Sequence, residues 1–268
     1  MLITILTLLS CAFYGAATAH VLSRLFDAKG PSQKTTVILS TLAILTHMVL
    51  LVNAVFTTQG QDLSFINVSL LTCWVIVLSV TAVSLRFPAT LLLPVVYGFA
   101  TILLFASLFM PHDIIVQSIR LEIGLVTHIS ISLLAYCVLV IATLYAVQFY
   151  FIDKRLKRKD LAIVYSHLPP LMVVERQLYQ LVFVGTALLS LALLSGFVFL
   201  DSMLAIENAH KTVLSIIAWG VFLAVVIGRK LRGWRGKSSV ITIMVGAGLL
   251  TLAYFGSRFV QEIILQRF

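Results

Sequence analysis

Apolar residues follow one another in long blocks along this chain, and short polar or charged stretches separate the blocks. A helix that crosses the roughly 30 Å hydrocarbon core of a bilayer needs about 20 mainly apolar residues. Eight blocks meet this length, at about 2–25, 35–56, 66–86, 88–110, 121–152, 177–200, 211–229 and 239–261. The pattern predicts an all-α, polytopic membrane protein: a bundle of eight transmembrane helices that forms one domain over residues 1–268.

The composition agrees with this class. Hydrophobic residues make up 60% of the chain and charged residues 11%, whereas soluble domains carry about 25% charged residues. We expect the first block to be a retained helix, because a signal peptide carries basic residues before its apolar run and none precede this one. The eight helices leave no room for a separate soluble domain.

Positive charge is distributed unevenly between the two ends of the predicted helices. Short cytoplasmic loops collect Lys and Arg. Of the 19 Lys and Arg residues, fifteen follow the first, third, fifth and seventh helices, and the other four are Arg120, Lys211, Arg258 and Arg267. We therefore expect both termini on the outer side of a bacterial inner membrane. The basic residues lie beside spans, where they face membrane lipid, and they do not indicate nucleic-acid binding.

Two histidines lie inside the predicted helices. His47 stands about a dozen residues into the second helix, in LAILTHMVLL, and His128 about seven residues into the fifth, in LVTHISISLLAYCVLV. At 1.5 Å per residue, both lie in the outer half of the membrane, roughly 10–15 Å below its surface. Small residues share their helical faces, which allows close approach of a helix or a ligand. We expect both faces to point into the protein.

Intramembrane histidines have two interpretations that the residues alone leave open. Each imidazole can be a structural group that bridges two helices through one hydrogen bond, or a functional ligand. Neutral imidazole binds haem iron and other transition metals. Outer-side basic residues, Arg120, Lys211 and Arg258, are candidates to hold propionates, and His210 is a further candidate ligand. The sequence predicts no catalytic residue, and it leaves enzymatic activity undecided.

Several segments resemble one family of membrane proteins. The runs THISISLLAYCVLVIATLYAVQF, HKTVLSIIAWGVF and GWRGKSSVITIMVGAGLLTLAYFGSR are similar to the cytochrome c assembly family of CcsA and ResC type, in particular its small HemX-like and YpjD-like inner-membrane members. The resemblance implies haem as cofactor, and as partners haem, membrane lipid and other cytochrome-biogenesis membrane proteins. It assigns His47 to the early intramembrane histidine and His128 to the histidine before the tryptophan-rich segment.

The chain departs from the full haem ligases of that family. Their tryptophan-rich segment corresponds here to SGFVFLDSMLAIENAHK, which has no tryptophan, and two further family histidines are absent. The expected function is therefore haem binding or haem handling, accessory to cytochrome c or haem biogenesis, without ligase activity. The alternative is a small-molecule or ion transport component of the inner membrane.

Reporter fusions test the predicted topology. A periplasmically active phosphatase fused to either terminus should be active, because both termini are expected outside. GFP fused to the C-terminus should stay dark. A bright GFP fusion with an inactive phosphatase fusion contradicts the orientation and moves His128 to the inner half of the bilayer.

Overall fold

The computed structural model describes residues 1–25, 27, 30–57, 60–62, 64–86, 90–110, 116–117, 123–158, 170–199, 206–256 and 259. Over this part of the chain it contains eight α-helices, seven of which are long and apolar enough to cross a membrane. The eighth, α4 (Leu92–Ser107), is apolar but has 16 residues. The all-helical prediction is therefore confirmed at this level, whereas the side of the termini stays a prediction.

The chain divides into two compact units, which are described one at a time. Unit 1 comprises Met1–Ile119 and Lys154–Pro170, and unit 2 comprises Arg120–Asp153 and Leu171–Phe268. The single domain expected from the sequence accordingly stays a prediction.

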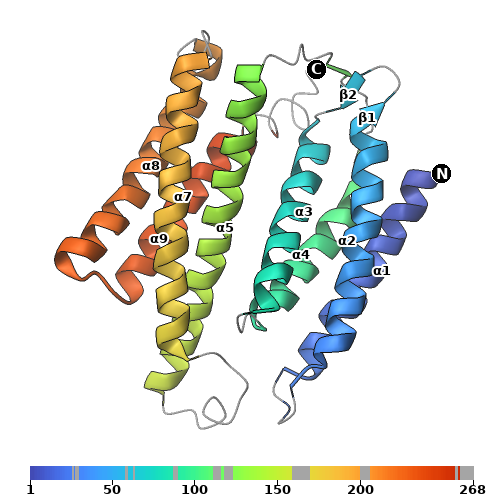
Figure 1. Ribbon diagram of the computed structural model, residues 1–268, viewed down its shortest axis with the longest axis horizontal. Helices are drawn as coiled ribbons and strands as arrows, with labels where there is room; N and C mark the ends of the chain where they lie inside the picture. Colours follow the sequence, from blue (N-terminus) through green and yellow to red (C-terminus); the bar gives the residue numbers. More distant parts are fainter. Residues whose placement is uncertain are drawn as a thin grey trace. The chain divides into compact units, whose positions relative to one another are not determined.

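Unit 1 is a ring of four helices in chain order. Besides α4 it contains α1 (Leu2–Ser23), α2 (Gln33–Val55) and α3 (Phe65–Ser84). Each helix packs against the next, and α1 also packs against α4 (Figure 1). The Ser32 hydroxyl accepts a hydrogen bond from the Thr35 N–H at the start of α2, which satisfies one of the free donors of that helix end.

Three very short strands, which the hydrophobic pattern does not predict, form an antiparallel sheet in unit 1. They are β1 (Phe56–Thr57), β2 (Gly60–Asp62) and β3 (Val116–Gln117), in the order β1-β2-β3. β1 and β2 lie at the end of the predicted second helix and in the connection that follows it, and β3 lies between the predicted fourth and fifth helices. Runs of two or three residues are too short to produce a visible period of two.

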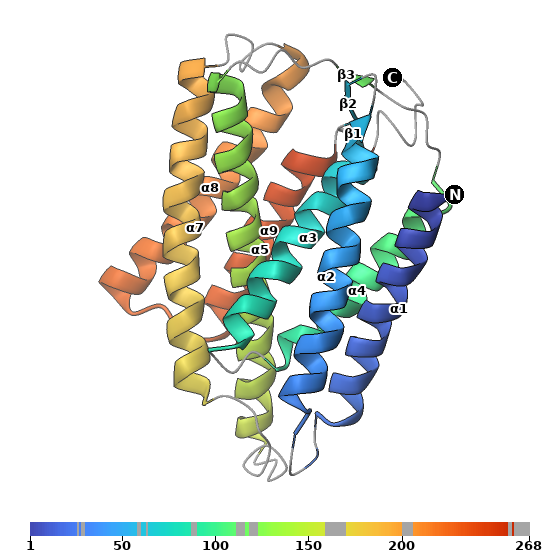
Figure 2. The same cartoon turned by 45° about the vertical axis from the view of Figure 1, so that its right-hand side comes forward.

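Unit 2 is a second ring of four helices, with consecutive helices again in opposite directions (Figure 2). It contains α5 (Ile123–Lys157), α7 (Leu171–Phe199), α8 (Ile206–Arg232) and α9 (Lys237–Thr251), and a π-helical turn, η1 (Leu252–Gly256), continues α9. Helix α8 packs against α7 and α9. On the other side of the ring, Gly185 of α7 meets Leu139 of α5 so closely that an added Cβ would lie 2.6 Å from the leucine.

The segment GWRGK forms the tight turn between α8 and α9, as its glycines predict. Gly233 and Gly236 have φ angles of 63° and 77°, which glycine adopts without strain. Between them, the Trp234 N–H donates to the Gly228 carbonyl over 3.1 Å, and the indole packs on Gly228, where a Cβ would lie 2.5 Å away. The Tyr179 hydroxyl of α7 donates to the Trp234 carbonyl over 2.9 Å. The turn is thereby attached to two helices.

We predict that Trp234→Ala impairs assembly in the membrane and lowers stability by about 1–3 kcal/mol. This is less than for a core tryptophan, because the side chain is 37% exposed. Thermal unfolding of the detergent-purified protein measures the effect. Leu231→Ala, which removes a side chain that is 75% exposed, is the control and should leave the melting temperature unchanged. Equal melting temperatures for Trp234→Ala and the parent would contradict an anchoring role.

Candidate functional site

His47 lies at the centre of unit 1. Its side chain is completely buried, as its small-residue face predicts. The imidazole Nδ1 lies 3.4 Å from the Tyr14 hydroxyl of α1, and the two rings meet edge to face with centroids 5.9 Å apart. The other ring nitrogen, Nε2, is buried and has no hydrogen-bond partner among the described residues.

A polar cluster contributed by all four helices of unit 1 surrounds this histidine. Tyr14 stacks on Tyr97 of α4 with centroids 6.0 Å apart. The Tyr97 hydroxyl shares a 2.9 Å hydrogen bond with Thr81 of α3. Except at His47 itself, the cluster therefore pairs its polar groups across helix boundaries.

An unpaired imidazole nitrogen is unusual in such a cluster. Buried polar atoms almost always have a partner, and an exception calls for an ion, a water molecule or a functional reason. When Nδ1 carries the proton and donates to Tyr14, Nε2 presents a free lone pair. His47 is then an available ligand for a metal or a hydrogen-bond donor.

His128 lies on α5 in unit 2 and is half-buried. Its Nδ1 is 3.0 Å from the Ser195 hydroxyl oxygen of α7, and its Nε2 is 3.5 Å from the Ser132 hydroxyl one turn further along α5. A separation of 3.5 Å is at the limit of a hydrogen bond. The imidazole therefore forms a clear hydrogen bond at Nδ1 and at most a weak one at Nε2.

The hydrogen bonds of Ser195 bear on which nitrogen of His128 carries the proton. The Ser195 hydroxyl can donate to the Ala192 carbonyl, which lies 2.9 Å away. When it does so, it accepts from the imidazole, and His128 is then the Nδ1–H tautomer with its lone pair on Nε2. Metal-binding histidines usually donate their second N–H to a protein acceptor in this way.

Aromatic residues continue from His128 along α5. Tyr136 hydrogen-bonds Thr251 of α9 over 3.1 Å and stacks on Tyr254 with centroids 5.1 Å apart. Tyr254 belongs to the π-helical turn η1, and such turns are frequent at functional sites. The sequence places Tyr136 on the face of His128, but it does not identify Tyr254 or Ser195. One sequence feature could have pointed to these two residues. Each has a hydroxyl group within an apolar span, and a buried hydroxyl needs a hydrogen-bond partner.

His210, the third predicted imidazole, is not brought to His128. It lies near the start of α8 and is exposed, and in the described part of unit 2 no hydrogen bond joins it to His128. Arg120 and Arg258 lie outside the described residues. His47 and His128 belong to different units, so each is described with its own unit. Among the described residues, no three His, Cys, Asp or Glu side chains form a metal-binding group.

Comparison with known proteins identifies the relatives of this chain. The cytochrome C assembly protein family matches residues 35–265. The chain belongs to this family. The inner membrane protein YpjD of Escherichia coli is 37% identical over 262 residues, which is 97% of this chain and 99% of the relative. An uncharacterized 28.8 kDa protein of Azospirillum brasilense is 28% identical over 140 residues, which is 52% of each chain. No solved structure matches the chain.

Membership in the cytochrome C assembly protein family confirms the resemblance inferred from the sequence. The nearly full-length similarity to an inner membrane protein, together with seven helices that can span a bilayer, confirms a multi-pass inner-membrane protein.

We predict that Tyr14→Phe lowers the free energy of unfolding by about 0.5–2 kcal/mol, because both nitrogens of the buried His47 then lack a partner. Thermal unfolding in detergent measures the change. Tyr145→Phe is a matched control, since that tyrosine is 2% exposed and its hydroxyl has no partner among the described residues. Removing the Tyr145 hydroxyl should be neutral or slightly stabilising. Equal losses in the two variants contradict a specific Tyr14–His47 bond.

Proposed function

We propose that this protein binds or handles haem in the inner membrane and serves as an accessory in cytochrome c or haem biogenesis, without acting as a haem ligase. One observation carries the proposal. His47 and His128 each have Nδ1 against a hydroxyl group of a neighbouring helix, while Nε2 is unpaired or weakly paired. In both units, Nε2 is thus the ring nitrogen without a strong protein partner, and it can bind a metal in the tautomer that carries its proton on Nδ1.

His128 is the better exposed of the two proposed ligands. It is half-buried, so a ligand would meet less surrounding protein at this imidazole than at His47. The Nδ1–H bond to Ser195 holds the imidazole plane and makes Nε2 a stronger donor to a metal. When bound, haem would supply an iron centre, and Nε2 of His128 would hold it.

His47 offers a different environment for the same chemistry. Because its side chain is completely buried, a haem reaches Nε2 only when helices of unit 1 move apart. We therefore assign the more accessible contact with haem to His128, whereas contact with His47 would require unit 1 to open. Arg120, Lys211 and Arg258 remain the proposed outer-side partners of the propionates, and His210 remains a further proposed ligand.

The Soret band of the purified protein tests the proposal. The parent, titrated with haemin in detergent, should develop a shifted Soret band that saturates. His128→Ala and His47→Ala should each lower or shift the band, because each removes an iron bond and leaves the remaining walls in place. The loss should be larger for His128→Ala, whose imidazole is the more accessible.

Neighbouring residues provide matched controls. Met48 and Ile129 follow the two histidines directly, and they are 47% and 43% exposed, so Met48→Ala and Ile129→Ala should bind haem as the parent does. If the parent shows no saturable Soret band, the haem proposal is wrong, and the result favours the alternative, a transport component. If both histidine variants match the parent, the imidazoles are structural.

A further inference from the structure

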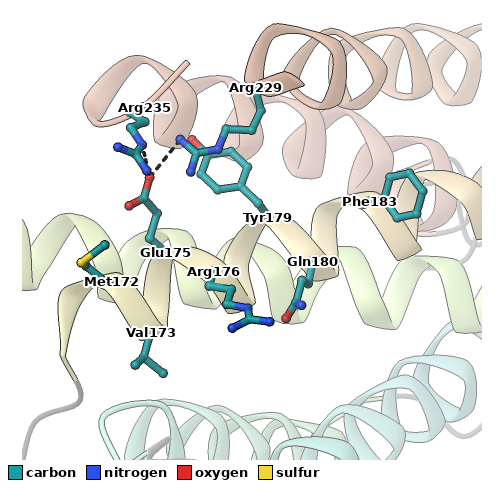
Figure 3. Close-up of a pocket in the computed structure, with 9 residues that line it drawn as sticks. All are labelled: Met172, Val173, Glu175, Arg176, Tyr179, Gln180, Phe183, Arg229 and Arg235. Carbon is teal, nitrogen blue, oxygen red and sulfur yellow. Dashed lines mark ion pairs between the residues drawn. The ribbon is translucent and has the colours of Figure 1, made fainter. Parts of the chain in front are cut away.

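A groove of about 610 Å³ lies on unit 2, far along α7 from His128 and near the turn between α8 and α9. Figure 3 shows the first turns of α7 forming its floor, with the end of α8 and the turn at one side. Its lining combines three arginines and one glutamate with aromatic and aliphatic side chains. These are Met172, Val173, Glu175, Arg176, Tyr179, Gln180, Phe183, Arg229 and Arg235.

The lining residues of α7 follow one helical face. Each of the positions 172, 175, 176, 179, 180 and 183 has another of them three or four residues away, which places them along one face of the helix. The same face continues through Ala187, Leu191 and Leu194, all of which are exposed. The face is therefore polar and basic for its first turns and apolar from Phe183 onward.

Charge in the groove is in surplus. The lining contains three guanidinium groups and one carboxylate, so its net charge is positive by two. Glu175 Oε1 pairs with both Arg229 Nη1 at 3.1 Å and Arg235 Nε at 2.9 Å. Arg176 is exposed and forms no ion pair with another described residue. Since a guanidinium has five N–H donors, donors remain for an anion.

Arg229 is held by the fold. It lies over the Tyr179 ring at 4.3 Å, and its guanidinium also donates to the Trp234 carbonyl over 3.4 Å. Its partner Glu175 is well shielded, with a side chain that is 12% exposed, whereas the Arg235 side chain is 61% exposed. A constrained donor such as Arg229 loses less conformational entropy when an anion binds.

We propose that this groove binds an anionic phospholipid whose headgroup carries two phosphates. The phosphates pair with Arg176, Arg229 and Arg235, which match phosphate oxygens through their forked N–H donors. One acyl chain then lies along the apolar continuation of the α7 face. The basic end of unit 2 is the end that the charge distribution predicts to be cytoplasmic, where basic recesses between helices recognise such headgroups. This inference does not depend on haem binding.

Native mass spectrometry of the full chain, titrated with tetraoleoyl cardiolipin in detergent, tests the proposal. Arg176→Gln should weaken binding about fivefold, the effect expected for one charge near the surface. Glu175→Gln should strengthen binding, because it removes the negative charge that opposes the headgroup. Lys230→Gln is the matched control: it removes one charge on an exposed residue of α8 that does not line the groove, and its binding should stay within twofold of the parent.

Two further arms separate a lipid site from a simple anion site. Dioleoyl phosphatidylcholine should bind at least tenfold more weakly than the diphosphate lipid, and millimolar inorganic phosphate should not displace the lipid. Displacement by phosphate, or equal binding of the two lipids, overturns the proposal. An unchanged Arg176→Gln, or equal losses in Arg176→Gln and Lys230→Gln, also overturns it. If Glu175→Gln does not fold, Arg176→Glu replaces it and should weaken binding further than Arg176→Gln does.

Discussion

Hydrocarbon offers no hydrogen-bond partner, so a polar side chain within a membrane-spanning helix must find one on its own helix or on a neighbour. Many Ser and Thr hydroxyls of this protein bond to the carbonyl three or four residues earlier. Larger polar groups reach across instead: the Trp74 indole of α3 donates to the Ile44 carbonyl of α2, and the Trp219 indole of α8 donates to Ser190 of α7. These bonds fix how neighbouring helices are rotated, and so they decide which side chains meet at each histidine.

The two histidines obtain a hydrogen-bond partner in the same way, each within its own unit. Each is held at Nδ1 by a hydroxyl group from the adjacent helix, Tyr14 for His47 and Ser195 for His128. The two environments differ in access, because His47 is completely buried whereas His128 is half-buried. One arrangement of hydrogen bonds therefore produces a shielded imidazole in unit 1 and a reachable one in unit 2.

Hydropathy predicts the spans to within a few residues but not the full helices. It ends the fifth helix at 152, whereas α5 continues through the basic residues up to Lys157, where positive charge is favourable at a helix C-terminus. It begins the sixth at 177, whereas α7 begins at Leu171 because Glu175 pairs with Arg229 and Arg235. Burial of His47 follows from its small-residue face, but its partner Tyr14 does not. Hydropathy measures preference for lipid over water, and it carries no information about which helices become neighbours.

A structural role alone explains His47 poorly. Its one hydrogen bond, at 3.4 Å, is longer than the usual 2.7–3.2 Å, and the buried, unpaired Nε2 carries a desolvation penalty of about 1–3 kcal/mol. Leucine, apolar and of similar size, would fill the same space without that penalty. A bond from Nε2 to a partner would remove that penalty, which is the physical ground for the ligand role proposed for this imidazole.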